Sequence, residues 1–282
     1  MLAIIGGSGL YNLENLNDVK ILDFETPFGK PSSPLINGFI GETEILFLAR
    51  HGVGHTLLPS EINYKANIAA LKQAGATHLL SVSAVGSLKE HIYPGHLCIV
   101  SQYIDKTKMR DSTFFGNGIV GHVMFADPVC HDLSEIIFQA AKTLNFDIHK
   151  DVTLAVMEGP QFSTRAESRH HISIGADIIG MTSMPEAKLA REAELCYGNL
   201  ALSTDYDCWK EDDAVTVEAV MKIMSENVEK SKQMIIEIAQ NLQNAKSECS
   251  CSTALENTIV TQRNKIPQET IEKLKSVMGR VL

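Results

Sequence analysis

The chain of 282 residues has an acidic balance, with a formal net charge of −9 and a pI near 5.6. This charge argues against a nucleic acid or an anionic membrane as a partner, although a phosphate site needs only local donors. No apolar run is long enough to span a bilayer, and the first residues, Met1–Ile5, carry no basic leader. With 44% hydrophobic residues, the composition is that of a globular protein, and we expect it in the cytosol.

Short β-rich apolar runs alternate with helical patterns, which is typical of an α/β protein. The predicted strands are Leu2–Ile5, Glu44–Ala49, His78–Ser83, Leu97–Ile104, Val152–Met157, Ile178–Gly180 and Tyr197–Leu202. The predicted helices begin near Ser60, Asp132, Thr164, Met184 and Thr216. After Asn241 the composition changes. Residues 246–263 are polar, and an amphipathic helix then starts at Pro267. We therefore expect one domain over residues 1–245, with residues 246–282 as an appendage packed on it.

The cysteines give no metal motif. The six are Cys98, Cys130, Cys196, Cys208, Cys249 and Cys251, and none forms the C-x-x-C pair of common zinc sites. The histidines at 51, 55 and 170–171 also lack carboxylate or cysteine partners at ligand spacing. We therefore predict no metal and reduced thiols in a reducing cytosol. For the C-x-C pair of Cys249 and Cys251, two ordinary tail cysteines are the simplest interpretation.

Small and polar residues follow several predicted strands, where donors can meet an anion. Ile4–Gly9 leads from a strand into a glycine turn, which lets backbone N–H groups approach a ligand closely. The Arg50–His51 pair, Ser83–Ser87 and Met181–Thr182 follow three further strands, and a guanidinium matches phosphate in a bidentate way. Together these segments indicate an oxyanion pocket. For the glycine segment, a structural turn that binds no ligand is the alternative. A dinucleotide-binding site, as in an oxidoreductase, is disfavoured because the third glycine of its motif is missing.

Two carboxylates, Asp205 and Asp207, come just after the predicted strand Tyr197–Leu202. In an open α/β sheet this position favours a ligand crevice. Ionised carboxylates accept hydrogen bonds and donate none, so they suit the N6 amino group of adenine and an N7–H formed on protonation. A 6-oxopurine would place its carbonyl against the same carboxylates. The pair therefore favours a 6-aminopurine, with two solvated loop aspartates as the alternative.

Six segments occur in one order: Ile4–Leu10, Leu48–Gly52, Ser83–Ser87, Met157–Ser163, Met181–Thr182 and Thr204–Trp209. In this order the chain resembles the trimeric purine nucleoside phosphorylase family, and within it the 5′-methylthioadenosine phosphorylases. The resemblance covers Met1 to about Asn241. It implies a single α/β domain with a mixed central β-sheet flanked by helices. Some heat-adapted members of this family have a similar C-x-C pair near the C-terminus that takes part in disulfides.

The resemblance also implies the residues of the site. The phosphate-binding residues are Ser8, Arg50, His51, Ser83, Ala84 and Thr182. On the base and sugar side, Phe162 stacks on the purine, Ser163 helps to bind it, and Met181 lies against the ribose. Asp205 and Asp207 are the catalytic, base-binding residues. A related 6-oxopurine-preferring subgroup has Asn where Asp205 stands, which again favours adenine.

The 5′ side of the substrate is expected to meet an apolar surface. Val217, Val220 and Met221 lie at helical spacing on one face and match the family's alkylthio pocket, although such a stripe is also typical of a core. By resemblance, His122 reaches the 5′ region of a neighbouring subunit; an exposed loop histidine is the alternative. The resemblance thus implies a homotrimer or a hexamer of trimers.

The expected reaction is reversible phosphorolysis of 5′-methylthioadenosine to adenine and 5-methylthioribose 1-phosphate, in purine and methionine salvage. Asp205 would share or donate a proton at N7, and Asp207 would bind N6 or orient its neighbour. No cofactor is expected, with inorganic phosphate as co-substrate. The alternatives are a phosphorylase of broader specificity for adenosine, inosine or guanosine, a nucleoside hydrolase, and a purine-binding module without catalysis.

Overall fold

The computed structural model describes residues 1–7, 16–210, 217–244 and 248–282; the side chains of 217–221 and 244 lie outside this description. The strands are β1 (Leu2–Gly6), β2 (Asn17–Leu22), β3 (Leu35–Ile40), β4 (Thr43–Ala49), β5 (His78–Ser87), β6 (Leu97–Asp105), β7 (Ile148–Val156), β8 (Ile178–Gly180) and β9 (Cys196–Asp205). The helices are α1 (Tyr64–Gln73), α2 (His131–Thr143), α3 (Arg165–Ser173), α4 (Ser183–Glu192), α5 (Val217–Asn244) and α6 (Gln268–Met278), with short 3₁₀ turns η1 (Cys251–Thr253) and η2 (Arg263–Lys265).

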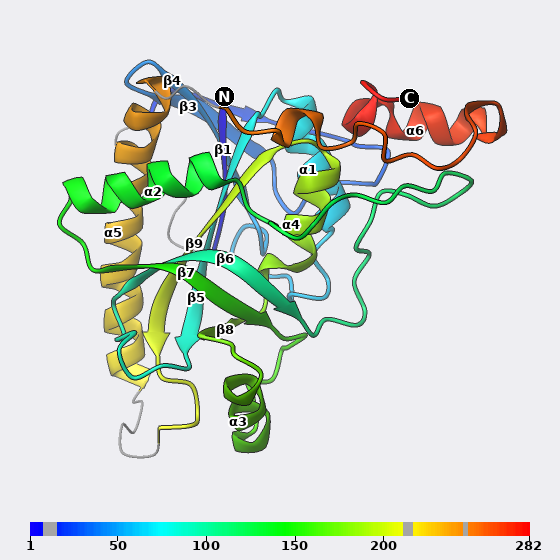
Figure 1. The fold of residues 1–282 in the computed structure, drawn as a ribbon. Coiled ribbons are helices and arrows are strands. Elements are labelled where there is room, and N and C mark those ends of the chain that lie inside the picture. The colour runs from blue at the N-terminus through cyan, green and yellow to red at the C-terminus, as the bar shows by residue number, and fades with distance from the viewer. Residues whose placement is uncertain (8–15, 211–216, 245–247) are drawn as a thin grey trace.

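These strands form one mixed nine-stranded sheet in the order β2-β3-β4-β1-β5-β8-β7-β6-β9 (Figure 1). β1 runs parallel to β4 and β5, and β5 runs parallel to β9. β9 also pairs with β6, so that β5, β8, β7, β6 and β9 close into a ring. The expectation of a single α/β domain with a mixed central sheet flanked by helices is confirmed.

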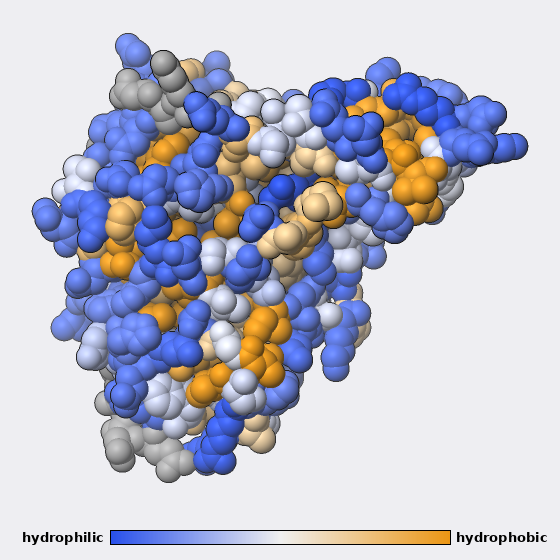
Figure 2. Space-filling view, viewed as in Figure 1, coloured by the Kyte–Doolittle hydropathy of each residue, from blue (hydrophilic) through white to orange (hydrophobic). Residues whose placement is uncertain are grey.

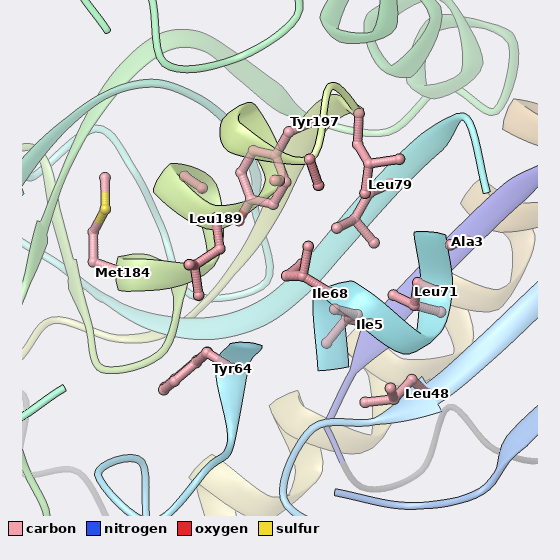
Figure 3. Packing of buried hydrophobic residues seen from close by; sticks show 14 of the residues in the cluster. Ala3, Ile5, Leu48, Tyr64, Ile68, Leu71, Leu79, Met184, Leu189 and Tyr197 are labelled. Atoms are coloured by element: carbon pink, nitrogen blue, oxygen red, sulfur yellow. The ribbon is translucent and has the colours of Figure 1, made fainter. Parts of the chain in front are cut away.

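The central strand β1 shows why the sheet has helices on both sides. All five of its residues are buried, as expected for a parallel strand covered on both faces. Its alternate side chains enter two different cores. Ala3 and Ile5 pack with α1 and α4 in the cluster shown in Figure 3, whereas Leu2 and Ile4 pack with α2 and α5. The carboxyl ends of the parallel strands therefore form an edge between two packed layers.

The sequence analysis missed the strands β2 and β3. β2 is almost entirely exposed, and so its sequence has no apolar run. β3 (LINGFI) is interrupted by Asn37 and Gly38, which are unfavourable in strands. The predicted start of α1 near Ser60 was also early, because Asn63 caps the helix by accepting a hydrogen bond from the Ala66 N–H. All seven predicted strands are present.

The C-terminal segment packs on the same body. Leu255, Leu274 and Val277 join the core that contains α1, and Glu194 forms an ion pair with Arg280. On the face drawn in Figure 2, hydrophilic side chains cover most of the surface, and hydrophobic ones gather over the region of α6. Among the residues described, no helix has both the length and the apolar character needed to cross a bilayer.

Candidate active site

A cavity of about 540 Å³ lies at the edge where the parallel strands end. Residues at or just past the ends of β1, β4, β5 and β9 line it, together with the segment after β8 and part of α5. This is the position at which ligands bind in open α/β sheets. The lining residues that the sequence analysis predicted are Arg50, His51, Ser83, Ala84, Phe162, Met181, Thr182, Asp205 and Asp207.

The other predicted site residues are placed differently. Ser163 lies beside the lining rather than in it, with its Oγ 3.7 Å from Met157 Sδ. His122 is exposed and is not part of the cavity of its own chain. Ser8 lies outside the described residues. Val217, Val220 and Met221 lie on α5, but their side chains are also outside the description.

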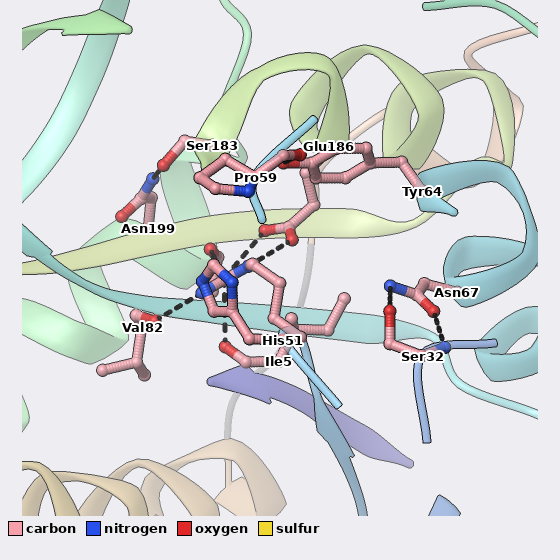
Figure 4. Close-up of polar contacts among 12 residues, drawn as sticks. Ile5, Ser32, His51, Pro59, Tyr64, Asn67, Val82, Ser183, Glu186 and Asn199 are labelled. Carbon is pink, nitrogen blue, oxygen red and sulfur yellow. Dashed lines mark hydrogen bonds and ion pairs between the residues drawn. The ribbon is translucent and has the colours of Figure 1, made fainter. Parts of the chain in front are cut away.

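Arg50, directly after the end of β4, is a fully buried guanidinium, and Figure 4 labels its partners Glu186 and Val82. Its Nε donates to Glu186 Oε2 over 2.9 Å, and its Nη2 donates to Glu186 Oε1 and to Ser81 Oγ. Its Nη1 donates to Val82 O over 3.0 Å. Burial alone would lower the pKa of Arg50, yet the Glu186 carboxylate outweighs burial, and the pKa is raised.

This arrangement differs from the expected one, in which the Arg50 guanidinium binds phosphate through two N–H groups. A guanidinium has five N–H donors. The bonds to Glu186, Ser81 and Val82 leave one Nη1 hydrogen without an acceptor among the residues described. Arg50 therefore offers an anion one direct donor and a fixed positive charge. Glu186, which directs the guanidinium, was missed because the sequence analysis took the segment that begins near Met184 only as a helix.

His51 lies beside Arg50 as a neutral ring. Its Nδ1 is 2.9 Å from Leu57 O, and because a carbonyl only accepts, Nδ1 carries the hydrogen. The ring stacks on His55 with centroids 4.2 Å apart. Burial, with a smaller contribution from the Arg50 charge, lowers the pKa of His51 to about 4. At neutral pH its Nε2 is thus an acceptor, which suits the P–OH group of a monoprotonated phosphate.

Two hydroxyl groups complete this end of the cavity. Ser83 Oγ is buried and has no hydrogen-bond partner among the described residues. Thr182 precedes α4 as its N-cap, but its side chain makes no capping hydrogen bond. A buried hydroxyl without a partner is costly unless a ligand or water satisfies it. Both side chains line the cavity, so their hydroxyls are available to an oxyanion beside the positive charge of Arg50.

At the other end, the two aspartates have unequal surroundings. Asp205 accepts hydrogen bonds from Thr204 Oγ1 and from the Asp207 N–H, both over 2.7 Å. Asp207 Oδ2 is buried without a partner among the described residues, and Asp207 has a positive φ of 53°. Burial, with Asp205 adding to it, raises the pKa of Asp207. Asp207 is therefore the carboxyl that holds a proton more readily than usual.

Apolar side chains form the rest of the wall. Phe162 lines the cavity although 84% of its surface is exposed. Gly159 (φ 72°) packs so closely on Met181 that an added Cβ would lie 2.6 Å from Met181 Sδ. From α5, Met224 and Val228 contribute further apolar surface. The sequence analysis missed these two, although they continue the same helical stripe that it identified at its first turns.

A second buried arginine was also missed. Arg110 donates to Glu158 Oε1 over 2.8 Å, and to the carbonyl oxygens of Met181 and Met184, both over 2.6 Å. It thereby ties the loop after β7 to the segment after β8. Glu158, which lies in the segment Met157–Ser163, is thus the partner of a positioning residue. The link could not be predicted because its members are far apart in the sequence.

Comparison with known families agrees with this geometry. The family model described as the phosphorylase superfamily matches residues 1–240. The chain belongs to the phosphorylase superfamily. The S-methyl-5′-thioadenosine phosphorylase of Geobacter sulfurreducens is 49% identical, over 99% of this chain and 98% of its own length. The sequence resemblance to this branch of the superfamily is confirmed.

Solved phosphorylase structures have the same fold. A methylthioadenosine phosphorylase from an antarctic soil metagenomic library superposes with a TM-score of 0.95 at 43% identity, covering 98% of each chain. A variant adenosine/methylthioadenosine phosphorylase of Schistosoma mansoni, solved in complex with methylthioadenosine, has a TM-score of 0.83 at 37% identity. The alignment covers 90% of this chain and 95% of the schistosome chain.

The lowered pKa of His51 predicts a pH-dependent stability of this phosphorylase. Below pH 6.5 the unfolded chain protonates this histidine, whereas the folded chain does so only near pH 4. The unfolded state then binds more protons, so the free energy of unfolding falls as the pH falls. Between pH 7 and pH 5 we expect His51 to account for a loss of roughly 1–2 kcal/mol. The free energy of unfolding is measured by denaturant at both pH values for the wild type and for His51→Asn. The loss between pH 7 and pH 5 in the wild type, minus the loss in His51→Asn, is the contribution of His51.

His131→Asn is the matched control, because the His131 side chain is 91% exposed at the start of α2 and is not part of the cavity lining. This variant should keep the pH dependence of the wild type. An equal pH dependence in His51→Asn and the wild type would contradict a neutral, buried His51.

Proposed function

We propose that this protein catalyses the reversible phosphorolysis of 5′-methylthioadenosine to adenine and 5-methylthioribose 1-phosphate. The observation that carries the proposal is one cavity with unlike ends. Arg50, His51 and the hydroxyl groups of Ser83 and Thr182 line one end, and Asp205 and Asp207 line the other. The first end suits a phosphate and the second suits a 6-aminopurine. The methylthioadenosine phosphorylases to which the chain is similar support this substrate.

The reaction needs no protein nucleophile. Phosphate held near Arg50 attacks C1′ of the ribose as the C1′–N9 bond breaks, and the sugar becomes oxocarbenium-like. A new C1′–O bond forms with phosphate, and the leaving adenine takes up a proton at N7. The bound dianion stabilises the developing cation, and fixed donors and charges supply most of the rate enhancement.

The proton at N7 belongs to the aspartate pair. The raised pKa of Asp207 and its unpartnered Oδ2 support this residue as the place where the proton is held. Asp205, whose carboxylate accepts from the Asp207 N–H, fixes the turn and keeps lone pairs for the N6 amino group or N7–H. This division moves the proton from Asp205, where the sequence analysis placed it, towards its neighbour.

The 5′ substituent meets the apolar wall. Met224 and Val228 line the cavity from α5, and the expected Val217, Val220 and Met221 lie one to three turns before them on the same helix. An apolar wall accepts a methylthio group and leaves a 5′-hydroxyl poorly paired. Contacts with one or two methylene equivalents discriminate between a methylthio group and a hydroxyl by only about 1–3 kcal/mol. We therefore expect adenosine to be a weaker substrate rather than to be excluded.

We further propose that the protein assembles as a homotrimer or a hexamer of trimers in the cytosol. It needs no cofactor, and inorganic phosphate is its co-substrate. Exposed apolar side chains support assembly, since Phe162, Met109 and Met124 are each more than three-quarters exposed, at 84%, 81% and 78%. His122 lies two residues before Met124 and outside the cavity of its own chain. Both facts suit a contribution from His122 to a neighbouring site.

Adenine release from 5′-methylthioadenosine, with and without phosphate, tests the function, with adenosine and inosine as parallel substrates. We expect release that requires phosphate and is strongest with 5′-methylthioadenosine. Release without phosphate would indicate a hydrolase and contradict the anion site. Phosphate-dependent cleavage that is strongest with inosine would instead indicate a broader purine nucleoside phosphorylase.

Ser83→Ala tests the phosphate end. We expect the KM for phosphate to rise by roughly 10- to 100-fold, as for a lost hydrogen bond to a charged group. The melting temperature should hardly change, because Ser83 Oγ has no hydrogen bond to the described protein. Ser134→Ala is the matched control, since Ser134 Oγ on α2 is also buried and also has no hydrogen-bond partner in the described part of the chain. An unchanged KM for phosphate in Ser83→Ala would remove Ser83 from the site.

Asp205→Asn tests the base end. An amide can donate to the carbonyl of a 6-oxopurine, which a carboxylate cannot. We expect kcat/KM for 5′-methylthioadenosine to fall by roughly 10- to 100-fold and the ratio of inosine to 5′-methylthioadenosine cleavage to rise. Asp151→Asn, the same change at an exposed position with positive φ, serves as control. The same base preference in Asp205→Asn and the wild type would refute the assignment.

A further inference from the structure

Four of the six cysteines gather at one place outside the candidate active site. The Sγ atoms of Cys130, Cys196, Cys249 and Cys251 all lie within 4.8 Å of one another. Three of these side chains are buried, and Cys249 is half-buried. The ligands come from three parts of the chain: the N-cap of α2, the first residue of β9, and the segment at η1. The proposed phosphorolysis makes no use of them.

We propose that these four thiols bind one zinc ion as a closed tetrahedral site that fastens the C-terminal segment to α2 and β9. A Zn–S distance of 2.3 Å implies sulfur–sulfur edges of about 3.8 Å in a tetrahedron. The observed separations bracket this value, from 3.3 Å between Cys196 and Cys249 to the 4.8 Å limit of the whole set. A disulfide needs only pairs of sulfur atoms in contact, whereas a metal needs all four to be mutual neighbours.

Hydrogen bonds that do not involve sulfur hold the main chain at three of the four cysteines, Cys130, Cys196 and Cys249. The Cys130 N–H donates to Tyr197 O over 2.7 Å, and the Cys196 N–H donates to Thr77 O over 3.0 Å. The N–H groups of Glu248 and Cys249 both donate to Asp132 Oδ2, over 2.9 and 3.0 Å. The backbone of the C-terminal segment is thus anchored to the first turn of α2, beside Cys130. Such preorganisation is what a metal site requires of its surroundings.

The surrounding charges favour a site of four thiolates. Zinc with four thiolates carries two net negative charges, which nearby cations stabilise. Cys196 and Cys249 line a cavity of about 700 Å³ whose other lining residues include three cations, Lys72, Lys275 and Arg280, and one carboxylate, Glu194, which pairs with Arg280. Cys130 is at the N-terminal end of α2, where the helix dipole also favours a thiolate. The cavity gives a metal a route to the sulfur atoms.

The sequence analysis expected no metal because it relied on ligand spacing. Only Cys249 and Cys251 are near each other in the sequence, and their C-x-C spacing is shorter than in common zinc motifs. The other two ligands arrive from α2 and β9 through the fold. A motif search detects ligands that one loop supplies, and it overlooks ligands that separate elements bring together.

The test is the metal content of the full-length protein, expressed with zinc and purified in reducing buffer. We expect about one zinc per chain, and in Cys249→Ser and Cys251→Ser a content close to none. Cys98→Ser and Cys208→Ser are the controls, because both thiols lie outside the cluster; these variants should keep the metal. Replacement of zinc by cobalt should give the intense visible absorption of a tetrahedral cobalt thiolate.

The proposal does not depend on whether the variants fold, since the wild type itself must bind the metal. Reduced wild-type protein that stays free of metal after zinc is added would overturn it. Mass spectrometry that finds the four cysteines in disulfides, together with no zinc uptake after reduction, would also overturn it and make the cluster a redox site. Equal metal content in the cluster variants and the wild type would place the metal elsewhere.

Discussion

The ion pair between Arg50 and Glu186 is the interaction on which the site depends. Arg50 donates to Glu186 on α4, to Ile5 O at the end of β1, and to Val82 O in β5. Tyr197 of β9 donates to the same carboxylate over 3.1 Å. One buried charge pair therefore joins β1, β5 and β9 to α4, the helix that follows β8. Removing one partner of such a pair typically costs about 3–5 kcal/mol, because the other charge stays buried.

Stability alone does not explain a buried ion pair, since apolar residues of similar volume often serve as well. What an apolar pair would lack is a fixed positive charge at the cavity. Glu186 keeps the guanidinium charged and oriented, while the neighbouring His51 stays neutral through burial. At the far end, no lysine or arginine among the described lining residues accompanies the two aspartates, and burial raises the pKa of Asp207. In the proposed reaction, the cavity thus separates an anion-binding end from a proton-holding end, which is the separation that phosphorolysis needs.

The sequence predicts those parts of this protein that follow from local patterns. β1 was predictable because it is an apolar run, and β9 because residues 197–202 are mostly apolar. Residues that follow strand ends were predictable as site candidates. β2 was not, because an exposed edge strand has no apolar signal. Glu186 and Arg110 were missed for another reason: their function is defined by partners on other elements, and a single sequence does not show which elements meet. The cysteine cluster was missed on the same ground.

The two buried arginines show how hydrogen-bond accounting separates a ligand-binding group from a structural one. Arg110 donates from Nε to Glu158, from Nη1 to Tyr64, Met181 and Met184, and from Nη2 to main-chain carbonyls. All of its five donors are engaged, so it can position the loops but can offer nothing to a ligand. Arg50 is equally buried, yet it retains a donor beside the unpartnered hydroxyl of Ser83. Burial therefore does not distinguish the two, whereas the unused donor does, and it favours Arg50 over Arg110 as the arginine that we propose for the anion site.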